Sequence, residues 1–372
     1  MNINLNIQVA DPAHVQIERA LRRQIQSGEL SPNQKLPSTD ELVRQLGVGR
    51  DAVHRAMVAL AKDGWIERKP MRGTFVRERT NAAYIGVMFS PSLTSETAHF
   101  QRTVYQSISR EFAGLKDCAW QCRAYDGFRG LNTGQAIETI PSYRNLARDM
   151  KNYTFAGFIQ ILGSLAGKKL TVVTKGYPVA KFGPPQDPMT DVALDYEGFG
   201  RESVEYMIKK GMKKIVYFRV MEDKTGGGLD RQGIESAAAR LRITKVEIHQ
   251  MQYAKQETCL QESAYNDMLA LMKKWDRTGK WPEGLIVSDD IAMYGVALAL
   301  AHRGIEMPKR LTVVTMANKG VNLWYGIPVV RNEFAPDEAA RELIHILSMR
   351  VHKKELPALP IKIPCKLSEE IR

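Results

Sequence analysis

The sequence predicts an α/β protein in two parts: a small N-terminal domain of three helices and a β-hairpin, and a larger domain with parallel sheets. Short amphipathic helical patterns and a basic hairpin crowd into the first 77 residues. From about residue 84 onward, apolar strand-like runs alternate with helical ones, which is the rhythm of βαβ units. The 372 residues, 44% of them hydrophobic, suffice for two or three domains with sizeable cores.

Composition narrows the class of protein. No stretch approaches the roughly 20 consecutive apolar residues of a membrane span, and the N-terminus lacks an export signal, so we expect a cytoplasmic protein with no membrane partner. The four cysteines form no CxxC pair, so we expect neither a disulfide framework nor a metal site. The 53 Lys and Arg against 41 Asp and Glu give a net charge of +12, which favours a polyanionic partner without identifying it.

Helix signals mark the first two elements. We expect the first helix from about Pro12 to Ser27, because Asp11 is a good N-cap and proline fits the first helical position. The second helix begins at Ser38-Thr39-Asp40-Glu41, a capping box in which a hydroxyl and a carboxylate satisfy backbone amides. It ends at Gly47.

The third helix follows directly and is predicted to end at Gly64. Its apolar positions repeat on one face and leave a polar face made of Arg50, Asp51, His54 and Arg55. Two β-prone segments, 65–67 and 74–76, are joined by the basic turn 68–73, which suits a hairpin.

A three-helix bundle followed by a hairpin is a winged helix-turn-helix. Its third helix fits the DNA major groove, and a basic wing carrying Lys69 and Arg72 suits phosphates or the adjacent minor groove. A small helical interaction domain is the alternative, because amphipathic helices and basic turns are common.

The run LPSTDELVRQLGVGRDAVHRAMVALAKDGWIERKPMRGTFV resembles the DNA-binding domain of GntR-family transcription regulators, over about residues 11–77. The resemblance implies that Arg50 contacts a base or a phosphate at the start of the recognition helix. It places Ser38, His54, Arg55, Arg72 and Gly73 nearby. Asp40 and His54 stand where the family often has arginine, and Gly49 and Ala52 replace hydroxyl residues, so the operator sequence of other members is not transferred.

The boundary of the two domains is predicted from a change in composition. The polar stretch RERTNAA ends where the apolar strand YIGVMFS begins. We therefore expect a winged domain over residues 1–77, a linker over 78–83 and a second domain over 84–372.

Three stretches of the second domain, VALDYEGFGRESVEYMIKKGMKKIVYF, DRQGIESAAARL and GLIVSDDIAMYGVALALAHRGIEMPKRLTVVTMAN, resemble landmarks of the LacI/GalR effector domain. That domain has a two-lobed, periplasmic-binding-protein-like fold. The resemblance implies that Arg231 and either Asp289 or Asp290 bind the ligand. Arginine and aspartate suit this role because a guanidinium forks onto oxygen pairs and a carboxylate accepts two hydroxyl hydrogen bonds. The alternative for each residue is a surface ion pair.

Other landmarks of this domain are less regular. The family signature after LTVV has an Asp where this sequence has Ala317, which separates its ligand preference from that of other members. Trp324 follows closely and is suited either to stacking on a sugar or to a core or dimer contact. The resemblance implies chain crossings between the lobes near residues 190–195, 316–320 and 359–361.

A GntR-like head on a LacI-like domain resembles the arabinose-repressor type of regulator. We therefore expect a transcription repressor without cofactor that binds a pseudo-palindromic double-stranded DNA operator as a homodimer and responds to a small polar effector, a sugar or sugar derivative. The runner-up is a DNA-binding regulator whose second domain binds no small ligand. An enzyme that uses the cleft of the α/β domain is a minor alternative. Asp289 and Asp290 could form an acid/base pair, but adjacent residues at a strand end point in different directions, which favours hydrogen bonding to a ligand.

Overall fold

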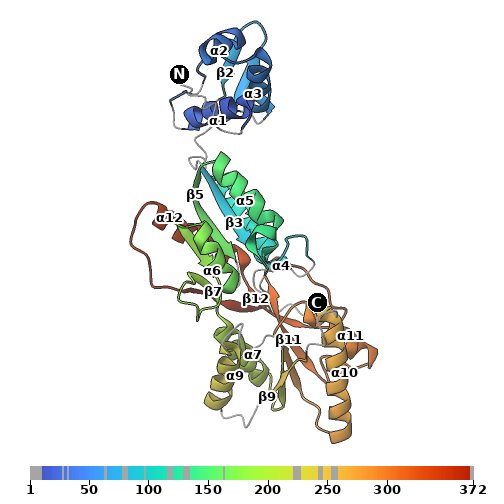
Figure 1. Ribbon diagram of the computed structural model, residues 1–372. Helices are drawn as coiled ribbons and strands as arrows, with labels where there is room; N and C mark the ends of the chain where they lie inside the picture. Colours follow the sequence, from blue (N-terminus) through green and yellow to red (C-terminus); the bar gives the residue numbers. More distant parts are fainter. Residues whose placement is uncertain are drawn as a thin grey trace. The chain divides into compact units, whose positions relative to one another are not determined.

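The computed structural model describes residues 11–26, 29–31, 33–62, 65–77, 83–95, 98–114, 120–128, 135–161, 164–220, 228–241, 246–252 and 259–368 (Figure 1). The predicted linker lies outside these residues except for Ala83, which is the first residue of a strand.

The head contains the five predicted elements. Three helices, α1 (Ala13–Gln26), α2 (Thr39–Leu46) and α3 (Arg50–Lys62), precede the antiparallel strands β1 (Ile66–Lys69) and β2 (Gly73–Val76). This order is that of a winged helix-turn-helix. Its core consists mainly of apolar side chains that repeat along the helices, including Ile17, Leu21, Leu42, Val53, Met57 and Leu60, together with Ile66 of β1.

Capping fixes the second helix where the sequence predicts it. The amide of Glu41 donates to the Ser38 hydroxyl over 3.2 Å, and the amide of Ser38 donates to the Glu41 carboxylate over 2.7 Å. At the other end Gly47 adopts φ +64, a left-handed conformation that glycine reaches without a steric penalty. These two caps hold α2 and α3 as separate helices and so position the start of α3.

The C-terminal domain contains two six-stranded sheets (Figure 1). The first, which we call the N-lobe sheet, has the order β13-β7-β6-β5-β3-β4. Its pairs β13–β7, β6–β7 and β5–β6 are parallel. Its strands are β3 (Ala83–Phe89), β4 (Trp120–Tyr125), β5 (Phe155–Ile161), β6 (Val179–Phe182), β7 (Val192–Leu194) and β13 (Ile361–Ile363).

The second sheet, the C-lobe sheet, has the order β14-β12-β11-β10-β8-β9 and is parallel except for β14. Its central strand β10 pairs with a neighbour on each side and is completely buried. This explains why β10 reads as an unbroken apolar run rather than an alternating one. The strands are β8 (Ile215–Arg219), β9 (Val246–Gln250), β10 (Gly284–Val287), β11 (Thr312–Asn318), β12 (Val330–Phe334) and β14 (Cys365–Ser368).

Helices belong to one lobe or the other according to their contacts. In the N-lobe, α12 packs on α4 and on strands β6 and β7; in the C-lobe, α7 packs on α9 and α10 packs on α11. Four helices lie between strands of the N-lobe sheet in the chain: α4 (His99–Gly114), the 3-10 helix η2 (Ile137–Thr139), α5 (Pro141–Asn152) and α6 (Ser164–Val173). Helix α12 (Pro336–Val351) precedes β13. The C-lobe helices are α7 (Tyr196–Lys209), α9 (Leu229–Arg240), α10 (Leu260–Thr278) and α11 (Ala292–His302).

The chain passes between the two lobes at three places. The first, at Asp195 between β7 and α7, lies within the predicted range 190–195. The crossing predicted at 316–320 is wrong: β11 runs through Asn318 and is followed by β12 in the same sheet, so the chain leaves the C-lobe only at Ala335. Polar residues inside β12 hide this strand in the sequence. The third crossing is at Pro364, a few residues after the predicted 359–361, because β13 first joins the N-lobe sheet.

Glycines let the C-lobe helices approach closely. A Cβ on Gly233 of α9 would lie 2.0 Å from the carbonyl oxygen of Glu197 on α7, and one on Gly200 would lie 2.2 Å from the carbonyl oxygen of Asp230. Gly295 of α11 meets the backbone of Gln261 on α10 in the same way. These contacts fix the position of α9, and with it the residues of its first turn.

Candidate nucleic-acid interface and effector site

The polar face of α3 is exposed in the head. Arg50, Asp51, His54 and Arg55, all predicted to face DNA, have exposed side chains. The same stripe continues one turn further to Val58, which is 44% exposed although it is apolar. Val58 was absent from the sequence-based prediction because its type suggests core; an apolar side chain at this place suits a thymine methyl group.

Each of three cations on this surface has an acidic neighbour. The guanidinium of Arg50 lies 3.7 Å from the Asp40 carboxylate, and that of Arg55 lies 2.7 Å from Asp51. On the wing, the ammonium of Lys69 lies 3.5 Å from Glu67. Exposed ion pairs contribute little to stability, so these cations can exchange a carboxylate for a phosphate at small cost.

The wing presents its basic residues at a tight turn. The amide of Arg72 donates to the carbonyl of Lys69 over 3.0 Å, and Arg72 is exposed. Gly73, predicted near DNA, has φ +110, and a Cβ there would lie 2.8 Å from Cε of Lys35. The glycine is therefore required by the hairpin itself.

Ser38 has a structural role as well. Its hydroxyl accepts the amide of Glu41 and so caps α2. The backbone amide of Ser38 donates to the Glu41 carboxylate and lowers the pKa of that carboxyl by stabilising its charged form. Sequence reasoning placed Ser38 near the DNA; the structure places it, exposed, at the start of the helix that precedes α3.

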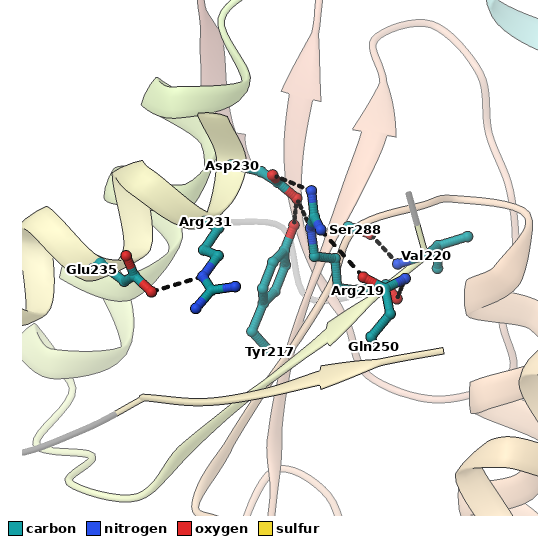
Figure 2. A network of polar contacts seen from close by, with 8 residues as sticks. All are labelled: Tyr217, Arg219, Val220, Asp230, Arg231, Glu235, Gln250 and Ser288. Carbon is teal, nitrogen blue, oxygen red and sulfur yellow. Dashed lines mark hydrogen bonds and ion pairs between the residues drawn. The ribbon is translucent and has the colours of Figure 1, made fainter. Parts of the chain in front are cut away.

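In the C-lobe, a buried polar network lies at the carboxyl end of β8 (Figure 2). Arg219 donates to both carboxylate oxygens of Asp230, from Nε over 2.8 Å and from Nη2 over 3.0 Å. The hydroxyl of Tyr217 donates to the same carboxylate over 2.6 Å. Burial and the Asp230 charge raise the pKa of Tyr217 well above its usual value. Below we call Tyr217, Arg219 and Asp230 the Arg219 network.

Arg231, the predicted ligand contact, lies one residue beyond this network. Its Nε donates to Glu235 on the same helix over 2.8 Å, and its side chain is 52% exposed (Figure 2). The helix thus turns Asp230 toward the ends of the strands, whereas Arg231 forms an exposed pair along α9. In the structure Arg231 therefore forms the surface ion pair that was the alternative to ligand binding.

Asp289 and Asp290 follow β10 and point in different directions, as adjacent residues at a strand end do. Asp289 accepts the amides of Ile291 and Ala292, over 2.9 and 2.7 Å, and so holds the start of α11. Burial and the Asp290 charge raise the pKa of Asp289 to about 6. Nearby, the pKa of Tyr196 is raised to about 12 by burial and by the charges of Asp289 and Asp230.

Asp290 is buried and contacts the end of the next strand. The side-chain amide of Asn318, the last residue of β11, donates to its carboxylate over 2.7 Å. The Tyr325 hydroxyl donates to its backbone carbonyl over 3.0 Å. Burial raises the pKa of Asp290, with the Asn318 contact opposing the shift. Asn318 was missed in the sequence, although its place at the end of an apolar strand marks it.

Trp324 lies in the segment between β11 and β12 and is 79% exposed. Its neighbour Tyr325 instead packs inward, with its ring centroid 4.9 Å from that of Tyr294. The structure thus brings Asp289 and Asp290 to one edge of the C-lobe sheet. It leaves Trp324 and Arg231 at exposed positions.

A cavity lies at the other end of these strands, where β10 and β11 begin. It has a volume of about 490 Å³ and is lined by residues of the last turn of α7, of the segment after it, and of the segments before β10 and β11, chiefly Tyr206, Lys210, Met212, Glu283, Lys309 and Arg310. None of the predicted ligand-binding residues belongs to it.

Within the residues that the structure describes, no group of three or more His, Cys, Asp and Glu side chains is placed to hold a metal ion. No helix in that part of the chain combines the length and apolar character needed to cross a membrane.

The two parts of the chain match two known families. Residues 13–76 match the bacterial regulatory proteins of the gntR family, and residues 204–369 match the periplasmic binding protein-like domain. The geometry and these matches together define a helix-turn-helix domain joined to an α/β domain. The helix-turn-helix domain is of the GntR type, and the second domain is periplasmic-binding-protein-like.

Two transcriptional repressors are similar to a short part of the chain. The HTH-type transcriptional repressor NagR of Bacillus subtilis (strain 168) is 40% identical over 74 residues, which are 20% of this chain and 30% of NagR. The arabinose metabolism transcriptional repressor of Geobacillus stearothermophilus is 29% identical over 82 residues, 21% of this chain and 22% of that protein. The chain therefore spans less than a third of the length of these two relatives.

Solved structures resemble most of the chain. The lac repressor dimer bound to operator and the anti-inducer ONPF has a TM-score of 0.59 at 14% identity, covering 85% of this chain and 97% of that one. A LacI-type regulator from Alkaliphilus metalliredigens, complexed with D-xylulofuranose, has a TM-score of 0.55 at 18% identity, covering 77% and 98%. At such identities the likeness shows the fold alone.

Proposed function

We propose that the chain is a ligand-responsive transcription regulator, a repressor that binds operator DNA through its winged head. The observation that carries this is the exposed polar face of α3 beside the basic wing, in a domain that matches the GntR type. Arg50, His54 and Arg55 are the residues for base edges and phosphates, and Lys69 and Arg72 are those for phosphates. Repression is supported by the two named relatives, both repressors.

The operator is double-stranded DNA read by a homodimer. A single winged head reads too few base pairs for strong discrimination, and a two-fold dimer recognises a pseudo-palindrome. We place the dimer contact in the C-terminal domain. The protein acts in the cytoplasm, where its operator lies, and has no catalytic role in this scheme.

The effector is a small polar molecule of the sugar class. In open α/β sheets, ligands bind outside the carboxyl ends of parallel strands. Asp289, Asp290 and Asn318 lie at those ends of β10 and β11, and their oxygens and amide suit hydroxyl groups. Trp324, which is exposed and follows Asn318 closely in the sequence, supplies an aromatic face for stacking on a sugar.

A second candidate is a regulator whose C-terminal domain binds no small ligand. It is favoured by the intramolecular partners of the polar groups at this edge: Arg219 is held by Asp230, Asp289 by the start of α11, and Asp290 by Asn318. A binding site would need some of these contacts to exchange with ligand.

Two measurements separate the candidates. Selection of duplexes by the full chain from a random pool, followed by sequencing, should return an inverted repeat. A thermal-shift screen of sugars and sugar derivatives should then raise the melting temperature with at least one compound if the effector proposal holds. Inverted repeats without any sugar-induced shift would favour the ligand-free regulator, and a pool without enrichment would remove the DNA-binding proposal.

A further inference from the structure

The tip of the wing carries a methionine that the proposed function leaves without a role. Met71 lies between the two wing strands and is fully exposed, with a relative accessibility of 107%. Its backbone φ is +58, in the left-handed region. An apolar side chain of this size, standing alone in solvent on a basic turn, contributes nothing to the core of the head.

The turn itself favours another residue at this position. Lys69 accepts the amide of Arg72 over 3.0 Å, so residues 69–72 form a hydrogen-bonded β-turn. Proline at the second position excludes the turns that need a positive φ there, and Met71 at the third position has a positive φ, which together define type II. Glycine or asparagine normally occupies that position, because a side chain there clashes with the backbone.

Met71 is therefore disfavoured by the hairpin and does not gain burial in the free protein. The presence of methionine at this position is therefore not explained by folding stability. It is explained by a contact that the side chain makes only when the protein binds a partner. Its neighbours in the chain indicate the partner. Arg68, Lys69 and Arg72 make the turn basic, although Lys69 also lies 3.5 Å from Glu67, and this charge suits the phosphates on either side of a DNA groove.

We propose that Met71 enters the minor groove beside the site read by α3 and packs against base edges or between two base pairs. This inference rests on the proposed DNA-binding function. A minor groove about 6 Å wide admits a single unbranched side chain, and methionine is among the residues that serve as apolar wedges there. The thioether has no charge and no hydrogen-bond donor for a phosphate, so it contacts the bases. Lys69 and Arg72 bind the phosphates of the two DNA strands.

The wedge gives the wing a part in specificity. A·T-rich steps present no amino group on the floor of the minor groove, whereas G·C pairs place the N2 amino group of guanine there. Met71 therefore favours A·T pairs at the flank of each half-site. Partial unstacking by the side chain also bends the duplex.

The test compares Met71→Gly and Met71→Leu with wild type on a duplex that the wild-type chain has selected from a random pool. Glycine fits the turn better, so Met71→Gly should melt at the same or a higher temperature than wild type. It should nevertheless bind the selected duplex about tenfold more weakly, since the lost contact is that of one buried apolar side chain. Met71→Leu should bind within about twofold of wild type, because an apolar side chain of similar volume remains.

Two further arms locate the contact. Replacing adenine by 2,6-diaminopurine in the flanks adds an amino group to the minor groove only; it should weaken wild type and leave Met71→Gly nearly unchanged. A circular-permutation gel shift should show a smaller bend with Met71→Gly. Met189→Gly, which removes another exposed methionine from the C-terminal domain, is the matched control and should match wild type in all of these DNA assays.

Equal affinity and equal bend for Met71→Gly and wild type would overturn the inference while leaving the proposed function intact. So would a change in self-association of Met71→Gly without DNA, since it would assign the side chain to a protein contact. Failure of the wild-type chain to bind any duplex would remove both the inference and the proposed function.

Discussion

Arg219 and Asp230 form a buried, two-point ion pair at the carboxyl end of β8, with donor–acceptor distances of 2.8 and 3.0 Å. Their side chains are 3% and 2% exposed. Asp230 lies in the first turn of α9, directly before Arg231, so the carboxylate occupies the side of the helix that faces the strands. β8 pairs with β10, so this ion pair lies at the same end of the sheet as the proposed effector site. Because its charged groups bind each other, an effector would contact other side chains, such as Asp290 and Asn318.

Breaking this pair is expected to destabilise the C-terminal domain strongly. Arg219→Met leaves the Asp230 carboxylate buried with only the Tyr217 hydroxyl, which should cost about 3–5 kcal/mol of unfolding free energy. Urea denaturation followed by circular dichroism measures this. The double variant Arg219→Met/Asp230→Leu should recover part of the loss, since it removes the uncompensated charge; a double variant no more stable than the single one would contradict this account.

The close approach of α7 and α9 gives a second prediction. Gly233→Ala places a Cβ against the Glu197 carbonyl and should lower the unfolding free energy by about 1–3 kcal/mol through overpacking. Glu235→Ala, two residues further along α9, removes only an exposed ion pair and should change stability by less than about 1 kcal/mol. Equal effects of the two variants would show that α7 and α9 have room to separate.

The pH dependence of stability tests the environment of Asp289. Because its pKa is raised to about 6 from 3.8, the folded state holds this proton more tightly than the unfolded state. The stability contribution of Asp289 is therefore complete below pH 4 and is lost as pH rises from about 4 to 6. Asp289→Asn, whose amide oxygen still accepts the amides of α11, should flatten this slope and stabilise the protein at pH 7 by on the order of 1 kcal/mol.

Urea titrations at several pH values between 4 and 7.5 measure that slope. Glu355→Gln, an exposed carboxylate in the segment after α12, serves as the control and should follow wild type. A steeper rather than flatter profile for Asp289→Asn would place Asp289 in a site that favours its charge.

The acidic neighbour of Arg50 leads to a prediction for the head. Asp40→Asn removes a carboxylate 3.7 Å from the guanidinium and lowers the negative charge near the DNA backbone. Binding to any duplex should tighten by about 0.5–1 kcal/mol at low salt, and this gain should shrink as salt is added. Fluorescence anisotropy on random and selected duplexes checks this; a gain confined to the selected duplex would instead make Asp40 a base-reading residue.

The head was predictable because its signals are local. The capping box at Ser38 and the glycine at residue 47 fix α2 by hydrogen bonds within a few residues, and the polar face of α3 follows from helical periodicity. The exposure of Val58 was not predictable in this way. Apolar type alone suggests burial, and only the fold shows which side of the element faces solvent.

The effector site depended on contacts between distant segments and was predicted less completely. Asp289 and Asp290 were placed at the sheet edge because they follow an apolar strand. Arg219 was hidden as the last residue of a buried strand, and its partner Asp230 comes from a helix eleven positions later, so no local pattern joins them. The crossing predicted at 316–320 failed for a similar reason, since pairing of β12 with β11 is set by the whole sheet.

The central claim, that the polar face of α3 reads specific DNA, is tested most directly by one titration. Wild type and Arg50→Ala are titrated, by fluorescence anisotropy, against the duplex that wild type selects and against a scrambled duplex of equal length. We expect Arg50→Ala, folded as judged by circular dichroism, to lose about 1–3 kcal/mol on the selected duplex, with a smaller loss on the scrambled one. Unchanged affinity of a folded Arg50→Ala for the selected duplex would contradict the account.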